Sequence, residues 1–319
     1  MGSLKPQQLL DGPGLRTLLQ TEDFGQWEAV VGQTLGHHRS RLLPGSVPFE
    51  AHIRAGAVEE FTVLHLQGLG QVELLREQCG HGVLWLPLQG LSHEVINGEE
   101  LLAEPGMGLL FRPGDHMRGS TSDAITGISI VVPESCLPLD ATRINGARSP
   151  LLHRGSSARR LIDAAWRLAG SAARPMASAR FAAEAFADAL QQWAEPTDPL
   201  DAGITAERRR RTVAEACQWM EEHLAERFSA SELSRVTNVS VRTLQYSFQQ
   251  ELGCTPMAQA KRLRLRHLRQ LLQDSEQRAC SVAELMEASG LLACGVTAAN
   301  YRQWCGESPR RTRQRSSRT

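Results

Sequence analysis

The stretch that decides the fold is Ser229–Gly253, which reads SASELSRVTNVSVRTLQYSFQQELG. Ser229 or Ser231 can begin one short helix and Ser240 a second, because a serine hydroxyl accepts a hydrogen bond from a first-turn amide. Leu244 and Phe248 recur at the spacing of one helical face, and the closing glycine stands where glycine commonly ends a helix. The stretch therefore predicts two short helices joined by a tight turn.

The outward face of the second helix carries side chains that form hydrogen bonds. Its members are Arg242, Thr243, Gln245, Tyr246 and Gln249. A helix fits the DNA major groove, where arginine can pair with guanine and glutamine with adenine. The pattern is typical of a helix-turn-helix, so we predict that this face contacts double-stranded DNA. The alternative is an ordinary solvated helix face.

A second unit with the same plan follows. Ser281 is expected to begin a helix over residues 282–289, and a further helix is expected from Gly295 to Trp304. The motif Gly306-Glu307-Ser308-Pro309 after it matches Gly253-Cys254-Thr255-Pro256 after the first unit. An internal repeat favours DNA binding more strongly than either unit alone.

One basic amphipathic helix is expected to connect the two units. Thr255 can cap it, and Pro256 occupies the first helical position, where proline is favoured. Its leucines share one face, whereas Arg262, Arg266 and Arg269 share another. A helix of about 18 residues is roughly 27 Å long, close to one DNA turn of roughly 34 Å. We predict that Arg262 contacts DNA.

The charged residues divide unevenly along the chain. The formal net charge is +0, but residues 1–206 hold 16 Lys and Arg against 23 Asp and Glu, and residues 207–319 hold 19 against 12. A carboxyl-terminal part with a net charge of +7 suits phosphate binding, whereas an amino-terminal part at −7 is repelled by DNA. A solvated charged surface is the alternative.

Length and composition exclude several protein classes. The 319 residues and 41% hydrophobic content leave room for two domains with their own cores. No apolar run approaches the roughly 18 residues of a membrane helix, so we expect no membrane partner and a cytoplasmic location. The 7 cysteines are scattered without a C-x-x-C spacing, which argues against a disulfide framework or a zinc finger.

The amino-terminal part predicts a β-rich domain. We expect a frayed polar segment up to about residue 20 and a short helix near Asp23–Leu35. Between about residues 41 and 135, short alternating apolar segments are separated by glycine and proline, as in a sandwich or small barrel. The expected strands cover residues 58–66, 72–74, 83–88, 109–111 and 125–132. Such a barrel can hold one small ligand.

Alanine-rich helices follow Pro150 and predict a helical hairpin over about residues 155–194. Its apolar faces either cover the barrel or pair with a second copy in a homodimer. Two prolines then predict a linker over residues 196–206. We therefore expect a sensory domain over residues 1–195 and an all-α domain over residues 207–319, and the fold class is α+β.

The turn Arg112-Pro113-Gly114-Asp115-His116 resembles part of a cupin motif, in which such a turn presents a metal-binding histidine. The companion His-x-His pair is absent, because His81 and His93 each stand without a second imidazole at that spacing. A metal site needs three or four convergent ligands. We therefore predict no metal and no cofactor.

Four residues are candidates to line the barrel and bind a small-molecule effector. They are Arg41, His65, Trp85 and Arg112. An arginine in such a barrel would suit a carboxylate, since its guanidinium can donate two parallel hydrogen bonds. The alternative for each of them is a place in the core or on the surface.

The carboxyl-terminal hundred or so residues resemble the DNA-binding domain of the AraC/XylS family of bacterial transcription regulators. The resemblance is carried by Arg264-Leu265 and Leu271-Leu272 in the connecting helix. In the second unit it is carried by Gly290, Asn300-Tyr301-Arg302 and Gly306-Glu307-Ser308-Pro309. The amino-terminal part resembles the cupin-like sensory domain of the branch that includes activators of aromatic-acid catabolism.

This resemblance implies an amino-terminal cupin-like β-barrel with a helical hairpin, and two helix-turn-helix units joined by a connector helix. It also implies a DNA-binding transcription regulator without enzymatic activity, which binds a promoter and recruits RNA polymerase. Activation is favoured over repression. The signal received at the barrel is a small molecule or, alternatively, a protein partner. A cupin-type metalloenzyme is a remote alternative, because it needs clustered metal ligands.

The resemblance places Arg242, Gln245 and Tyr246 at base-contacting positions of the first reading helix. The second reading helix departs from the family pattern, because Val296 and Ala299 on its face cannot donate a hydrogen bond to a base. Apolar contact with a thymine methyl remains open to them, and Arg302 can reach a phosphate. Our hypothesis is that the first unit specifies sequence and the second mainly adds affinity.

Overall fold

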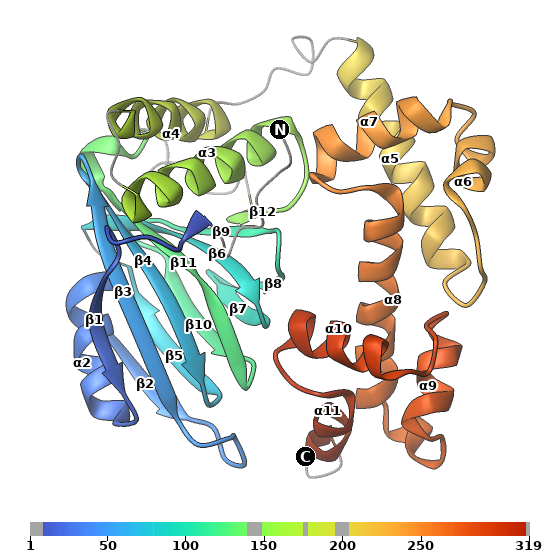
Figure 1. The fold of residues 1–319 in the computed structure, drawn as a ribbon, viewed down its shortest axis with the longest axis horizontal. Coiled ribbons are helices and arrows are strands. Elements are labelled where there is room, and N and C mark those ends of the chain that lie inside the picture. Colours follow the sequence, from blue (N-terminus) through green and yellow to red (C-terminus); the bar gives the residue numbers. More distant parts are fainter. Residues whose placement is uncertain (1–8, 79, 139–148, 175–177, 195–203, 317–319) are drawn as a thin grey trace. The chain divides into compact units, whose positions relative to one another are not determined.

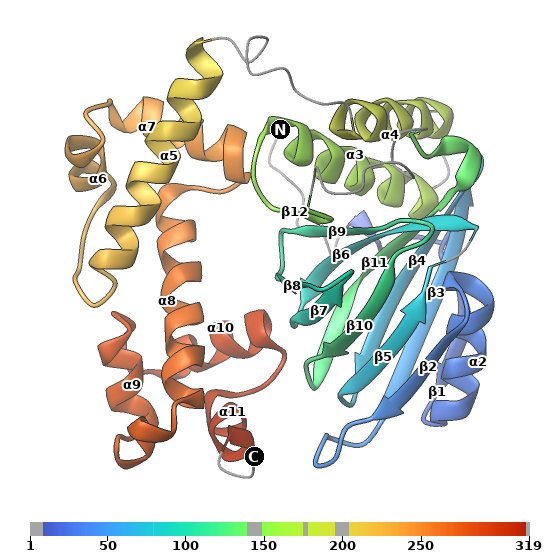
Figure 2. The same cartoon turned by 180° about the vertical axis from the view of Figure 1, so that it is seen from behind.

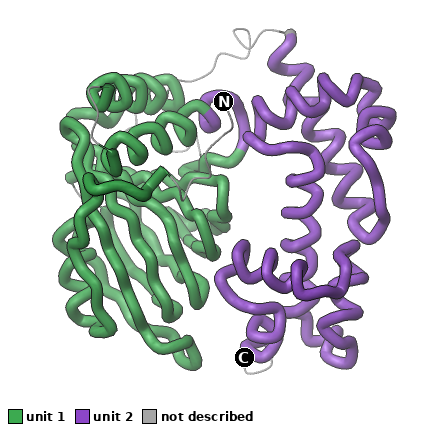
Figure 3. Tube along the Cα trace, in the orientation of Figure 1, with its two compact units in different colours: residues 1–153, 160–195 green, residues 154–159, 196–319 purple. Residues whose placement is uncertain are grey.

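The computed structural model describes residues 9–78, 80–138, 149–174, 178–194 and 204–316 (Figure 1). The chain divides into two compact units, of which one comprises residues 1–153 and 160–195 and the other residues 154–159 and 196–319 (Figure 3). The predicted linker lies outside the described residues up to residue 203, and a helix begins at Ile204. Each unit is described by itself below.

The first unit contains two antiparallel sheets. The larger has the strand order β1-β3-β4-β11-β6-β9-β12, and the smaller has the order β2-β5-β10-β7-β8. The strands of the larger sheet are β1 (Arg16–Thr21), β3 (Glu50–Val58), β4 (Phe61–Leu69), β11 (Ala124–Pro133), β6 (His81–Gln89), β9 (Gly108–Phe111) and β12 (Leu151–Leu152). Those of the smaller are β2 (His38–Leu42), β5 (Val72–Glu77), β10 (His116–Thr121), β7 (Ser92–Ile96) and β8 (Glu99–Ala103).

The predicted barrel therefore takes a jelly-roll-like form, in which two sheets enclose the core instead of one closed cylinder. Inward-facing residues of both sheets, including Ile53, Leu64, Val83 and Met117, form a single hydrophobic cluster. Alternate residues along each strand point to opposite faces, so these positions share one interior.

The amino-terminal segment is more ordered than the sequence analysis predicted. Residues 16–21, most of which fall within the segment expected to be polar and frayed at its end, form β1 and pair with β3. The paired residues are separated by 30 to 39 positions in the chain, which is why local polarity was a poor guide. Helix α2 (Phe24–Leu35) follows, and Asp23 caps it by accepting from the amides of Gly25 and Gln26 at 2.8 and 3.2 Å.

The helical hairpin consists of α3 (Ser156–Ala173) and α4 (Ala179–Ala194), which lie against the larger sheet (Figures 1 and 2). Many apolar residues of both helices are buried, among them Leu161, Leu168 and Leu190. Phe186 of α4 meets Phe61 of β4 edge-on, with ring centroids 5.1 Å apart. These helical faces therefore cover the sheet.

The described residues of the second unit form helices joined by turns and include no strand. Its helices are α5 (Ile204–Glu222), α6 (Ala230–Val236), α7 (Val241–Leu252), α8 (Pro256–Gln273), α9 (Val282–Ala288), α10 (Gly295–Cys305) and α11 (Pro309–Ser316). Helices α6 and α9 begin with the same capping box, in which a serine and a glutamate three residues later exchange hydrogen bonds. The internal repeat thus extends to the backbone contacts that start each helix.

A core of its own supports the first helix-turn-helix. Leu244 and Phe248 of α7 are fully buried, and they pack with Leu233 of α6 and with Val213 and Met220 of α5. Gly253 ends α7 in the left-handed conformation, with φ 65°. The face of α7 that holds Leu244 and Phe248 is thereby committed to the core, which leaves the opposite face to solvent.

The second helix-turn-helix is completed by α11, which the sequence analysis did not predict. The hydroxyl of Tyr301 lies 2.9 Å from that of Thr312 in α11, and the Thr312 hydroxyl donates to Glu307 at 2.8 Å. Thr297 and Cys305 of α10 are buried as well. A buried polar network thus joins α10 to α11.

Replacing Phe248 with alanine should destabilise the second unit by about 3–5 kcal/mol, because it removes a fully buried ring and leaves a cavity. Urea unfolding followed by helical circular dichroism would measure this change. The neighbouring variant Gln249→Ala, on the exposed face, should stay within about 0.5 kcal/mol of the parent. Equal losses in the two variants would contradict the assignment of the faces.

Candidate functional site

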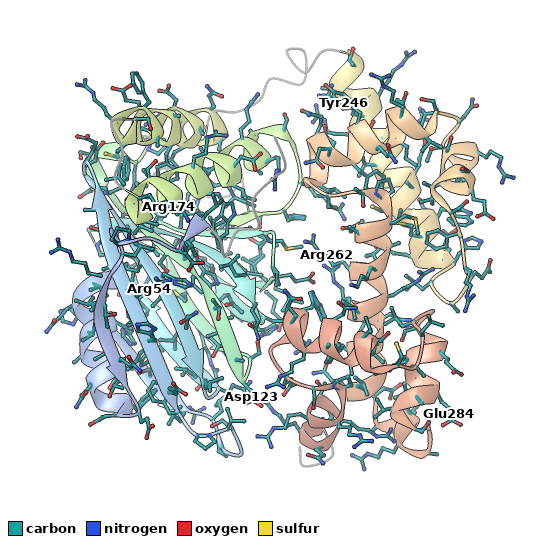
Figure 4. All side chains as sticks on the ribbon, viewed as in Figure 1. Arg54, Asp123, Arg174, Tyr246, Arg262 and Glu284 are labelled. Atoms are coloured by element: carbon teal, nitrogen blue, oxygen red, sulfur yellow. The ribbon has the colours of Figure 1, made fainter. Side chains whose placement is uncertain are left out.

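The exposed face of α7 brings together every residue that the sequence analysis assigned to the first reading helix. Arg242, Thr243, Gln245, Tyr246 and Gln249 are all exposed, and Tyr246, labelled in Figure 4, is 54% exposed. Ser240 caps the helix by accepting from the Thr243 amide at 3.1 Å. The face is therefore held at a defined orientation on a buried core.

Two arginines of α8 differ in their surroundings. Arg264 is structural, because its Nε donates to the carbonyl of Leu224 at 3.0 Å and its guanidinium lies 4.8 Å from the centre of the Phe228 ring. Burial lowers the pKa of Arg264. Arg262, the predicted DNA contact, is partly buried on the same helix (Figure 4).

Helix α10 presents an exposed face that is largely apolar. Val296 is 70% exposed, and Ala299 and Arg302 are exposed on the same helix. Leu292, in the turn before the helix, is 64% exposed and extends the apolar surface. Large apolar side chains usually avoid such exposure, so these positions are suited to contact another molecule.

Helix α11 adds basic residues that the sequence analysis did not assign to a site. Arg310 is exposed, Arg313 donates to the carbonyl of Arg278, and Arg315 pairs with Glu307 at 3.2 Å. The signal in the sequence was the run of arginines after Pro309, where a proline can begin a helix.

The first unit contains a partly open cavity of about 130 Å³ between its two sheets and α2. Four aromatic residues contribute to its wall, namely Trp27, Phe49, Trp85 and Phe111. Aliphatic side chains from both sheets supply most of the remainder, including Ile53 and Leu66. A predominantly apolar, concave space of this kind is typical of a small-molecule site.

Two charged residues line the cavity, Arg76 of β5 and Glu94 of β7. Oε2 of Glu94 and Nε of Arg76 are buried and have no hydrogen-bond partner. Burial raises the pKa of Glu94 to about 8, while the nearby Arg76 opposes this shift. Burial also lowers the pKa of Arg76 to about 10. At neutral pH the arginine is therefore charged and the carboxyl is mostly neutral.

Of the four residues predicted to bind an effector, Trp85 lines this cavity and the other three are not among its wall residues. Arg41 is exposed and pairs with Glu73 on the outer face of the smaller sheet. His65 is on the face of β4 opposite to Leu64 and Leu66, and its Nδ1 lies 2.8 Å from Nη2 of Arg54.

Arg112 is buried within its own turn, where its amide donates to Oδ2 of Asp115 at 2.7 Å. The sequence analysis missed Arg76 and Glu94 because the strands expected there ended before Arg76 and did not include residues 92–96. The alternation of Val72, Leu74 and Arg76 was the signal that could have found the arginine, since all three face the cavity.

The sequence matches a family model described as an AraC-binding-like domain over residues 27–193, which is more than half of the chain. It also matches a helix-turn-helix domain model over residues 233–315. The chain belongs to the AraC family of transcription regulators. This AraC-family regulator thus combines a cupin-like ligand-binding domain with a helix-turn-helix DNA-binding domain.

Individual relatives of the regulator match over the DNA-binding part. The probable thc operon regulatory protein of Rhodococcus erythropolis is 35% identical over 94 residues, covering 30% of this chain and 28% of that protein. The HTH-type transcriptional regulator GbdR of Pseudomonas aeruginosa is 36% identical over 95 residues, covering 30% and 25%. The chain thus spans about a quarter of the length of these curated relatives.

Among solved structures, the AraC-like transcriptional activator CuxR is similar to the regulator, with 18% identity and a TM-score of 0.47. The match covers 72% of this chain and 88% of CuxR.

The described part of the regulator contains no cluster of three or more histidine, cysteine, aspartate or glutamate residues that could hold a metal ion. His116, in the turn that resembles a cupin motif, is exposed, and its Nδ1 lies 3.8 Å from Oε2 of Glu77. No described helix is long and apolar enough to cross a membrane.

The ionisation of Glu94 should make the regulator less stable as the pH rises from about 4.5 to 8. The folded state keeps a proton that the unfolded state loses in this window, because the pKa of the buried carboxyl is raised to about 8. The unfolding free energy of the parent should therefore fall by up to about 1.4 kcal/mol per pH unit relative to Glu94→Gln. Urea unfolding at several pH values would measure both slopes.

The matched control is Glu100→Gln, since Glu100 is exposed on the adjacent β8. The unfolding free energy of this variant should change with pH as that of the parent does. If the unfolding free energy of Glu94→Gln showed the same pH dependence as that of the parent, the Glu94 carboxyl would not be held neutral by burial.

Proposed function

We propose that this regulator is a sequence-specific activator whose promoter binding is controlled by a small molecule in the cavity of its first unit. The observation that carries the proposal is the partly enclosed apolar cavity lined by two charged side chains, each of which has one buried atom without a hydrogen-bond partner. A ligand that binds one arrangement of the protein more tightly than another shifts the population toward it. Bound beside a promoter in the cytoplasm, the protein would recruit RNA polymerase.

The two reading helices, α7 and α10, would have different roles in DNA binding. The exposed face of α7 offers hydrogen-bonding groups that distinguish bases, whereas that of α10 offers Val296 and Ala299. Arg302 on α10 and Arg262 on α8 are placed on exposed or partly exposed positions that suit phosphates. We therefore propose that the first unit specifies sequence and the second mainly adds affinity.

We also propose a sensory region over residues 1–195, a linker over residues 196–206 and a DNA-binding region over residues 207–319. The buried faces of α3 and α4 are occupied by the sheet, so a homodimer through the hairpin would use its outer side. Phe181 of α4 is 71% exposed there and would be part of such a contact.

A second candidate is control by a protein partner instead of a small ligand. Phe181 of the first unit, which is 71% exposed, favours it, because exposed apolar residues also mark protein contacts. Thermal unfolding against a panel of small acids, sugars and amines separates the two. A ligand specific for the native state raises the unfolding midpoint by mass action, whereas a protein-controlled regulator would respond to none of them.

Selection of random duplex DNA by the full-length protein at about 0.15 M salt tests the function directly. A site with information in a single patch, or in two distant copies of it, is the expected result. Information in two patches one helical turn apart would show that α10 reads bases. Enrichment of no sequence, with or without a small-molecule panel, would contradict the proposed function.

Gln245→Ala should weaken binding to the selected site by about 1–3 kcal/mol and relax the preference at one position, because it removes hydrogen bonds to a base edge. Arg302→Ala should weaken binding to all sequences alike, because a phosphate contact carries no sequence information. Competition binding with selected and scrambled duplexes would measure both effects. Gln218→Ala, on α5, is the control and should bind as the parent does.

Replacing Ala299 with arginine should add a second patch of sequence information, because α10 would then present a hydrogen-bond donor to the major groove. Repeating the duplex selection with this variant would reveal the new patch. An unchanged site width and sequence would mean that the face of α10 does not reach the bases.

A further inference from the structure

We propose that the cavity binds a small monocarboxylate with an apolar body, whose carboxylate is held jointly by Arg76 and Glu94. This inference rests on the proposed function, because it names the chemical class of the effector.

The strand register places both residues on one inner face. Strand β10 lies between β5 and β7, where its Met117 is opposite Arg76 and its Gly119 is opposite Glu94. A Cβ atom at Gly119 would lie 1.6 Å from Oε2 of Glu94. The carboxyl group therefore lies directly over the glycine, and it occupies space that any other residue at position 119 would take.

The side chain of Arg76 is anchored at its terminal nitrogen, and both Arg76 and Glu94 have an atom without a hydrogen-bond partner. A terminal nitrogen of Arg76 donates to the carbonyl of Leu35 at 2.9 Å, and the guanidinium carbon lies 5.3 Å from the centre of the Phe111 ring. Its Nε is nevertheless buried without a partner, as is Oε2 of Glu94. Buried polar atoms without partners are costly, so their presence in a cavity wall points to a missing ligand group.

The charge of the site selects an anion. Arg76 is positive at neutral pH, while burial holds the pKa of Glu94 near 8, so the carboxyl is mostly a neutral donor. Two donors and one positive charge match the oxygens of a carboxylate. An amine would be repelled by Arg76 and would require Glu94 to ionise in an apolar environment.

The other ionisable groups near this pair do not reverse that balance. Arg76 and Glu94 are the charged residues among the described wall. His38 of β2 lies near Arg76. Burial lowers the pKa of His38, and the positive charge of Arg76 lowers it further, so the imidazole is mostly neutral at pH 7. Glu28 of α2 is engaged with Ser40, which lowers the pKa of its carboxyl.

The remaining wall accommodates an apolar body about the size of one ring. The cavity measures about 130 Å³ and is bounded by Trp27, Phe49 and Trp85 as well as by aliphatic side chains. An apolar protein cavity of roughly 150 Å³ holds a benzene-sized molecule. Benzoate and hexanoate are therefore suitable probes, and benzylamine and benzyl alcohol are their counterparts without a carboxylate.

Titration calorimetry with the full-length protein tests the proposal at pH 7 and pH 9. Benzoate or hexanoate should bind at pH 7, and benzylamine and benzyl alcohol should bind at least tenfold more weakly. Affinity for the acid should fall about tenfold at pH 9, because ionised Glu94 repels the carboxylate. This pH dependence is measured on the parent protein, so it does not depend on whether a variant folds.

Three variants complete the test. Glu94→Gln keeps a neutral donor, so it should bind the acid at pH 7 within a few-fold of the parent and lose the pH dependence. Arg76→Met should lose at least tenfold in affinity. Arg118→Met is the control, because Arg118 lies on β10 but pairs with Glu73 on the outer face.

Preferred binding of benzylamine, unchanged binding in Arg76→Met, or binding of neither acid would overturn the proposal. DNA selection by the same preparation separates this failure from failure of the proposed function. If a DNA site is selected but neither acid binds, the carboxylate assignment is wrong and the regulator function stands. If acids bind but no DNA sequence is ever selected, the proposed function is wrong instead.

Discussion

The antiparallel register of β5, β10 and β7 is the constraint on which the chemistry of the first unit depends. Because side chains alternate between faces, this register turns Arg76 and Glu94 toward the same apolar interior and sends Glu73 and Arg118 outward. Only the absence of a side chain at Gly119 makes room for the Glu94 carboxyl. If the pairing of one of these strands shifted by one residue, its buried and exposed side chains would exchange faces.

The second unit contains the same helix-turn-helix scaffold twice, and the two copies differ in the side chains on their exposed faces. The same capping box begins α6 and α9, and a left-handed glycine ends both α7 and α10. The repeated contacts are those that build each helix-turn-helix. The side chains on the exposed faces have diverged, since α7 presents hydrogen-bonding groups and α10 presents apolar ones.

A regulator of this kind needs both stable scaffolds and sites that are incomplete without a partner. The buried cluster around Phe248 holds the helices of the second unit together, and the cluster around Leu64 joins the two sheets of the first. The unpartnered atoms of Arg76 and Glu94 and the exposed Val296, in contrast, each lack a partner within the described structure. The buried clusters supply stability. The unpartnered atoms and the exposed apolar residue mark the places at which another molecule can bind and change the populations of the protein's states.

The sequence by itself determined the helix-turn-helix repeat, its caps and the exposed face of α7, because these depend on contacts between residues three or four positions apart. It also indicated the helical hairpin and the β-rich character of the first unit. The pairing of β1 with β3, the packing of α11 on α10, and the cavity depend on residues distant in the chain. Only the tertiary structure could separate Trp85, on the cavity wall, from Arg41, His65 and Arg112. Burial and strand register decide which face a charged side chain occupies, and local sequence does not encode them.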